Sequence, residues 1–167
     1  MKVPEGVAVE VANGVIRVKG AAGEFETKFN PGLLEVRVEN GEIAVTPKRK
    51  ETRALRAAKH AVEAHVRNLF QGLEKEFEKK LEVVFAHFPV SVEVKGKEVL
   101  IKNFLGEKLS RKARVVGSAQ VSVAGNIVTV KGRSKEDVGQ TANNIVRAAK
   151  IRARDIRVFQ DGVYYSE

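Results

Sequence analysis

Basic side chains gather in the second half of this 167-residue chain, where they could neutralise the phosphates of a nucleic acid. Residues 1–88 carry 15 Lys and Arg against 13 Asp and Glu, a net charge of +2, whereas residues 89–167 carry 15 against 8, a net of +7. Residues 102–157 alone hold 13 basic and 4 acidic side chains. Each cation that neutralises a phosphate releases counterions, so this composition favours RNA or DNA as a partner.

The candidate contacts fall into groups defined by the elements expected to carry them. One group lies in an expected loop over residues 106–115, a second surrounds the start of an expected helix at Ser134, and a third follows an expected strand over residues 151–159. Ser134 would also leave free backbone N–H groups that suit a phosphate, and amides on the helix could read bases or ribose hydroxyls. For any single residue the alternative is a solvated surface charge. The candidate RNA-binding residues are Lys102, Arg111, Lys112, Arg114, Lys131, Arg133, Ser134, Lys135, Gln140, Asn143, Arg152, Arg154 and Arg157.

No group of residues in the sequence has the pattern of a catalytic or metal site. His60 and His65 are five apart on an expected helix and so lie on different faces, and there is no Cys to join them as a ligand. No glycine-rich loop ends in Gly-Lys-Ser/Thr, and Ser134 is explained by a helix cap. The segment Gly20-Ala21-Ala22-Gly23 matches the GXXG pattern of KH modules, but a turn between strands explains it better. We expect no catalytic residue, no metal, no cofactor and no small-molecule substrate.

Neither secretion nor membrane insertion is indicated. The first ten residues lack the apolar core of a signal peptide, and no stretch approaches 18 apolar residues. A basic membrane-surface binder would need a helix with a Lys/Arg face and a bulky apolar face, which is missing. The absence of Cys is compatible with the cytoplasm.

Alternating apolar and polar residues predict hairpins around Asn13-Gly14 and Asn40-Gly41, because both residue types tolerate the positive φ of a tight turn. A period of three to four residues predicts a helix over residues 51–71, and alternation then predicts a strand over residues 77–87. The same order follows again. It comprises strands over residues 90–94 and 98–102, a hairpin over residues 119–131, a helix over residues 135–150, a strand over residues 151–159 and a short tail.

The chain also repeats its own sequence. Val9-Glu10-Val11 matches Val92-Glu93-Val94 at an offset of 83, and the apolar positions of the following hairpin match at an offset of 85. We therefore expect an α+β fold with two tandem duplicated domains, each an antiparallel β-sheet with one α-helix packed on one face. The first domain, residues 1–88, would be a scaffold. The second, residues 89–167, would be the basic RNA-binding domain with a C-terminal tail.

Several strings resemble the large-ribosomal-subunit protein six family in its archaeal and eukaryotic form. They are VKGAAGE, RAAKHAVEAHVRNLFQG, EVVFAHFPVSVEV, GRSKEDVGQTANNI and RDIRVFQDGVYY, and together they cover nearly the whole chain. The tail matches the family pattern except that Val163 stands in place of Ile.

The resemblance implies a structural constituent of the large ribosomal subunit in the cytoplasm, with two similar domains that arose by duplication. It implies binding to 23S-type ribosomal RNA near the stalk base and the sarcin–ricin loop, mainly through the second domain. It puts Arg133, Ser134, Lys135, Gln140 and Asn143 first among the contacts. Neighbouring ribosomal proteins would be further partners. An RNA-processing enzyme, or its accessory RNA-binding subunit, is the alternative.

Overall fold

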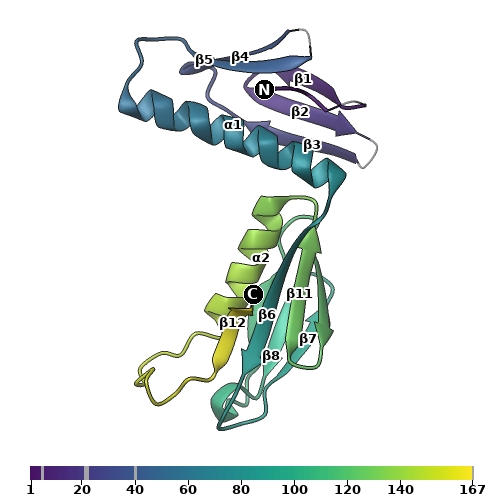
Figure 1. The fold of residues 1–167 in the computed structure, drawn as a ribbon. Coiled ribbons are helices and arrows are strands. Elements are labelled where there is room, and N and C mark those ends of the chain that lie inside the picture. Colours follow the sequence, from purple (N-terminus) through teal and green to yellow (C-terminus); the bar gives the residue numbers. More distant parts are fainter. Residues whose placement is uncertain (5, 21–22, 40, 167) are drawn as a thin grey trace. The chain divides into compact units, whose positions relative to one another are not determined.

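The structure is a computed structural model that describes residues 1–4, 6–20, 23–39 and 41–166. The chain divides into two compact units, Met1–Lys75 and Glu76–Glu167. Within the described residues there are two α-helices, and every strand pair is antiparallel (Figure 1). The predicted α+β class is therefore confirmed.

The first unit contains a three-stranded sheet, a separate hairpin and one long helix. The Asn13-Gly14 turn is confirmed, because φ is +49° at Asn13 and +79° at Gly14. Helix α1 begins after Thr52, whose hydroxyl accepts a 3.3 Å hydrogen bond from the Leu55 N–H. Ala21, Ala22 and Asn40, on which two of the predicted turns depend, lie outside the described residues. The elements are β1 (Ala8–Ala12), β2 (Val15–Gly20), β3 (Gly23–Lys28), β4 (Leu34–Glu39), β5 (Glu42–Pro47) and α1 (Arg53–Glu74).

The second unit contains two sheets and one helix. The sheet orders are β7-β8-β9 and β10-β11-β6-β12. Helix α2 contacts β9 of the first sheet and β6, β11 and β12 of the second. The elements are β6 (Phe77–Val84), β7 (Ser91–Lys95), β8 (Glu98–Lys102), the 3₁₀ turn η1 (Phe104–Gly106), β9 (Arg111–Arg114), β10 (Gln120–Ala124), β11 (Ile127–Gly132), α2 (Lys135–Ala148) and β12 (Gly162–Ser166).

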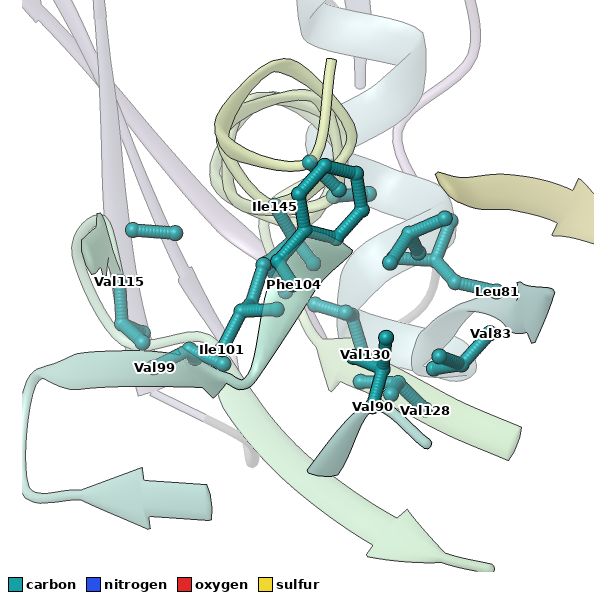
Figure 2. Close-up of a cluster of buried hydrophobic side chains, with 14 of the residues drawn as sticks. Leu81, Val83, Val90, Val99, Ile101, Phe104, Val115, Val128, Val130 and Ile145 are labelled. Carbon is teal, nitrogen blue, oxygen red and sulfur yellow. The ribbon is translucent and has the colours of Figure 1, made fainter. Parts of the chain in front are cut away.

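One hydrophobic core fills the second unit (Figure 2). The buried positions of α2, which include Val138, Ala142 and Ile145, recur at three- and four-residue steps and so form one face. They pack with buried strand residues such as Ile101 and Val130. This burial holds α2 and the strands in a fixed relation, which matters because both carry candidate RNA contacts.

The strand after α1 differs from expectation. We expected residues 77–87 to close the first domain, with the boundary after residue 88. Instead β6 lies in the middle of the four-stranded sheet of the second unit, paired with both β11 and β12. Its buried side chains, Leu81 and Val83, belong to the core of that unit. Alternation predicts a half-buried strand correctly but contains no information about which strands it pairs with.

Two predictions about local structure in the second half were wrong. The expected loop over residues 106–115 ends in strand β9, paired with β8 in a register that places Ile101 opposite Arg111. The expected final strand over residues 151–159 is an irregular loop, and the strand lies later, in β12. Residues 151–159 contain alternating Ile, Arg and Val side chains, but Ile156 and Val158 are exposed, so no sheet face buries them.

The order of elements in the two units is similar. A three-stranded antiparallel sheet, a hairpin and a helix occur first in one unit and then in the other. Strands β5 (Glu42–Pro47) and β11 (Ile127–Gly132) are separated by the same 85 residues as the sequence matches.

Candidate nucleic-acid interface

Strand β9 separates three neighbouring cations that we expected to act together. Successive side chains of a strand point to opposite faces, so Lys112 and Arg114 lie on one face and Arg111 on the other with the buried Ala113. Lys112 and Arg114 are exposed. Their face is the outer face of the β7-β8-β9 sheet.

Arg111 is bound into the protein. Its guanidinium donates to both carboxylate oxygens of Glu107 at 2.8 and 2.6 Å, and to the carbonyl oxygens of Ala148 and Lys150 at 3.0 and 2.9 Å. It also lies 4.2 Å from the ring centre of Phe104. The Arg111 hydrogen bond, against a smaller effect of burial, lowers the pKa of Glu107. Arg111 thus joins β9 to the end of α2, and four of its five N–H donors are already used.

Lys102 shares the outer face with Lys112 and Arg114, since β8 and β9 pair in register. Glu93 and Glu98 lie on the same face. Lys102 bonds to Glu93, and this bond is the main reason that the pKa of Glu93 is lowered. Lys112 is 3.9 Å from Glu98, a loose and exposed pair. Lys95, opposite Glu98 on β7, is exposed on this face as well. The face therefore presents four cations on rigid strands, of which Arg114 has no side-chain partner among the described residues.

The second group surrounds the start of α2. The Ser134 hydroxyl accepts a 3.2 Å hydrogen bond from the Asp137 N–H, which confirms the predicted cap. Lys131 lies 3.3 Å from Glu78 and Arg133 lies 3.7 Å from Glu76. These acids come from the segment that we had assigned to the first domain.

Lys135 lies over the ring of Phe77, with Nζ 5.8 Å from the ring centre. The Asp137 carboxylate accepts a 3.4 Å hydrogen bond from the Ser118 N–H. Together with Glu136 it already supplies negative charge to the positive end of the helix dipole. These two carboxylates would repel a phosphate bound to the backbone N–H groups at the start of α2. The cations around the helix start are therefore better RNA contacts than those N–H groups.

The predicted amides on α2 divide between two roles. Gln140 and Asn143 lie opposite the buried face at the helical repeat of 100° per residue. Gln140 donates to the Asn144 side chain at 2.9 Å. Asn144 in turn donates to the Arg114 carbonyl oxygen at 2.9 Å. Asn143 is half-buried and has no hydrogen-bond partner among the described residues, so its amide is left for an RNA contact, whereas Asn144 holds β9.

The third group lies on the loop between α2 and β12. All three arginines, Arg152, Arg154 and Arg157, are exposed. Because the segment is a loop, the expected alignment of Arg152 and Arg154 on one strand face does not occur. Arg157 forms an ion pair with Asp155 at 2.8 Å, which lowers the pKa of Asp155. Arg154 lies 4.8 Å from the ring centre of Phe159.

A buried carboxylate anchors the end of this loop. Asp161, 1% exposed, accepts hydrogen bonds from the backbone N–H groups of Ala86 and His87 at 3.2 and 3.3 Å. His87 Nδ1 lies 2.9 Å from Asp161 Oδ1, and the His87 ring stacks on Phe159 with 4.9 Å between centroids. Burial raises the pKa of Asp161, but these hydrogen bonds and the charge of His87 together bring it below its ordinary value.

Sequence reasoning missed two cations, Arg147 and Lys150. Arg147 lies in the last turn of α2 and Lys150 two residues beyond the helix, and both are exposed. Basic residues in a last helical turn are usually explained by the helix dipole, so the sequence contained no sign that they face a pocket. When the charge is counted by the structural units, residues 1–75 carry +3 and residues 76–167 carry +6. The asymmetry is smaller than the sequence boundary indicated, but its direction is the same.

Within the described ranges, no three His, Cys, Asp or Glu side chains are arranged so that they could hold a metal ion. Neither of the described helices combines the length and the apolar character needed to cross a membrane.

Comparison with known proteins identifies the relatives of this chain. The family model described as Ribosomal protein L6 matches residues 88–162. Three curated archaeal proteins, each named large ribosomal subunit protein uL6, match 98% of this chain. The protein from Methanosarcina mazei is 43% identical over 93% of its own length, that from Methanocella arvoryzae 40% over 93%, and that from Methanobrevibacter smithii 44% over 92%. At this identity and coverage, the chain belongs to the ribosomal protein L6 family.

Proposed function

We propose that this chain is a structural constituent of the large ribosomal subunit that binds 23S-type ribosomal RNA through its second unit. The family consists of structural, non-enzymatic proteins of the cytoplasmic large subunit, and this protein is one of them. An RNA-processing enzyme is therefore not proposed. The finer location, near the stalk base and the sarcin–ricin loop, remains part of the proposal, as do neighbouring ribosomal proteins as further partners.

The observation that carries the RNA-binding proposal is the outer face of the β7-β8-β9 sheet. Lys102, Lys112 and Arg114 project from two paired strands to the same side. A strand holds its side chains at fixed spacing, so three cations can meet successive phosphates without ordering a loop first. Their acidic partners are exposed to solvent, which screens such ion pairs, so RNA phosphates can compete with them.

Lys131, Arg133 and Lys135 extend the proposed interface at the start of α2, and the loop arginines Arg152 and Arg154 extend it beyond the helix end. Arg111 is not proposed as a phosphate contact, because its guanidinium donates to Glu107 and to two backbone carbonyl oxygens. Arg157 is a weaker candidate than its neighbours, because Asp155 occupies its guanidinium.

We also propose that the two units are duplicated copies of one module, the first serving as a scaffold. The equal order of elements and the constant offset of β5 and β11 support this. In this scheme β6, which follows the first helix, corresponds to β12, which follows the second. Both lie in the sheet of the second unit.

Charge reversal with chemical footprinting on large-subunit rRNA tests the RNA-binding proposal. The triple variant Lys102→Glu, Lys112→Glu and Arg114→Glu reverses the three outer-face cations of β8 and β9. We expect it to lose the footprint, and single neutral substitutions to lower the salt dependence of binding by about one phosphate contact each.

A matched triple variant, with Lys28, Arg37 and Lys48 changed to Glu, reverses three exposed cations of the first unit. We expect it to keep the footprint. If the first-unit variant loses the footprint while the outer-face variant keeps it, the wrong unit has been assigned to RNA binding.

A further inference from the structure

A pocket of about 420 Å³ lies between the end of α2, the loop over residues 151–160 and strand β12. Its volume is within the range of sites that hold small organic groups, roughly 300–1,000 Å³. Apolar and aromatic side chains form most of its wall, including Val146, Ile151, Ile156, Phe159 and Tyr164. Ile156 is 70% exposed and Tyr164 48% exposed, so the wall is accessible from solvent.

Two cations line the same pocket. Arg147 and Lys150 come from the end of α2. Among the residues that the structure describes, neither side chain has an ion-pair or hydrogen-bond partner. The pocket therefore combines an apolar interior with unused positive charge, an arrangement that suits a ligand with a flat apolar part and an anionic part.

The one carboxylate that lines the pocket does not oppose an anion. Asp161 is almost fully buried, and its oxygens accept hydrogen bonds from the backbone of Ala86 and His87 and contact the His87 ring. Asp155, the acid of the adjoining loop, is held by Arg157. The negative charge around the pocket is thus already bound, whereas the positive charge is not.

We propose that this pocket receives an unpaired nucleotide of the bound ribosomal RNA. Its base lies against the exposed Tyr164 ring, because the Phe159 ring already contacts His87 and Arg154, and its phosphates are held by Arg147 and Lys150. The inference rests on the proposed RNA-binding function and makes it more specific. Proteins recognise irregular RNA largely through unstacked bases that lie on aromatic rings.

An acidic protein segment is the other occupant that this chemistry could take. The surroundings favour RNA, because the loop that closes the pocket also carries Arg152 and Arg154, both exposed. Two of the chain's few aromatic residues, Phe159 and Tyr164, meet at a site bordered by cations. The cations counted in the sequence suit the RNA phosphates, and the pocket adds one position at which a base is bound.

Two fluorescein-labelled RNA hairpins test the inference, one with a single bulged nucleotide and the other fully paired. Their affinities for the full chain are measured by fluorescence anisotropy at one salt concentration. We expect the bulged hairpin to bind about tenfold more tightly, since base–aromatic stacking contributes about 1–3 kcal/mol per base. Tyr164→Ala should abolish this preference. Tyr164→Phe, which keeps the ring but loses the 3.0 Å hydrogen bond from the hydroxyl to the Gln160 carbonyl oxygen, should keep it.

Tyr165→Ala is the matched control, because Tyr165 is the residue of β12 next to Tyr164, is 50% exposed and does not line this pocket but lies near Lys79. It should keep the preference. Equal binding of the two hairpins by the unaltered protein would overturn the pocket inference alone, whereas binding of neither would overturn the proposed function as well. The inference would also be overturned if Tyr164→Ala still preferred the bulged hairpin, or if Tyr165→Ala lost that preference to the same extent. So would unchanged RNA binding by Tyr164→Ala with impaired incorporation into large subunits, which would indicate a protein segment in the pocket.

Discussion

The side chain of Asn144 donates a 2.9 Å hydrogen bond to the carbonyl oxygen of Arg114, and so connects α2 to the free edge of strand β9. The Thr141 hydroxyl accepts a 3.0 Å hydrogen bond from the Val116 N–H one turn earlier on the helix. Arg111 reaches the carbonyl oxygen of Ala148 one turn later. The Arg114 carbonyl oxygen, on the edge strand β9, would otherwise be left for another chain to pair with. Side chains of both elements thus hold α2 against β9 and the residues that follow it.

Removing this connection should weaken the fold without weakening RNA binding. We expect Thr141→Val to lower the free energy of unfolding by about 1–3 kcal/mol, because Thr141 is fully buried and the Val116 N–H would lose its acceptor. Asn144→Ala should lower it by about 1 kcal/mol. Urea unfolding measures both. Asn143→Ala, a change at a half-buried side chain that has no hydrogen-bond partner among the described residues, should leave the stability nearly unchanged. A lower RNA affinity in folded Asn144→Ala would contradict this structural role.

Arg111 and Lys112 are neighbours in sequence but should respond oppositely to substitution. Arg111→Ala removes the contacts with Glu107 and two carbonyl oxygens, so we expect a lower melting temperature. Lys112→Ala should leave the melting temperature unchanged and reduce the slope of log affinity against log salt by about one phosphate. Thermal unfolding and RNA titration at several salt concentrations separate the two effects. Equal loss of stability in both variants would contradict the assignment of opposite faces.

The fold class and most element positions follow from the sequence, because period and turn chemistry are local properties. The turn at Asn13-Gly14, the cap at Ser134 and the strand Glu98–Lys102 were all predicted correctly. What local pattern cannot supply is pairing. Strand β6 has the expected alternation, but its neighbours are strands that follow it by tens of residues in the chain. The unit boundary was misplaced for this reason.

The candidate site was predictable as a set of cations but not as a surface. Strand alternation decides that Arg111 points inward and Lys112 outward, and the sequence was interpreted as a loop at this point. The pocket beside Arg147 depends on how the loop over residues 151–160 returns to β12, which is a tertiary feature. Ion pairs across strands, such as Lys131 with Glu78, likewise require the β6 pairing to be known.

The buried carboxylate of Asp161 should make stability depend on pH in acid. Its pKa in the folded protein is below the ordinary value of about 4. A group with a lowered folded pKa stabilises the fold fully above its unfolded pKa, and the contribution is lost as pH falls through the folded pKa. We expect Asp161→Asn to be less stable than the unaltered protein at pH 7, with the difference shrinking as the pH is lowered below about 4. Urea unfolding across this range measures the difference.

The control for the acid effect is Asp155→Asn. The pKa of Asp155 is also lowered, by Arg157, but this pair is exposed and solvent screens it. Its difference from the unaltered protein should be small at every pH. If the Asp161→Asn difference is independent of pH, the carboxylate does not act through its charge.

Gly117 and Gly96 allow the effect of crowding to be separated from that of backbone strain. Both have φ near +60°, at +58° and +59°, a region that costs a residue with a Cβ about 1–2 kcal/mol. A Cβ on Gly117 would overlap the Asp137 carboxylate, whereas a Cβ on Gly96 would have no atom within 4 Å. Both Ala variants should therefore lose stability, Gly117→Ala by more, because Asp137 must also give up its bond to the Ser118 N–H. Adding Asp137→Ala to Gly117→Ala should bring the loss of stability closer to that of Gly96→Ala. Urea unfolding of the unaltered protein, the two glycine variants and the double variant checks this. Equal losses at the two glycines would show that Asp137 moves aside without cost.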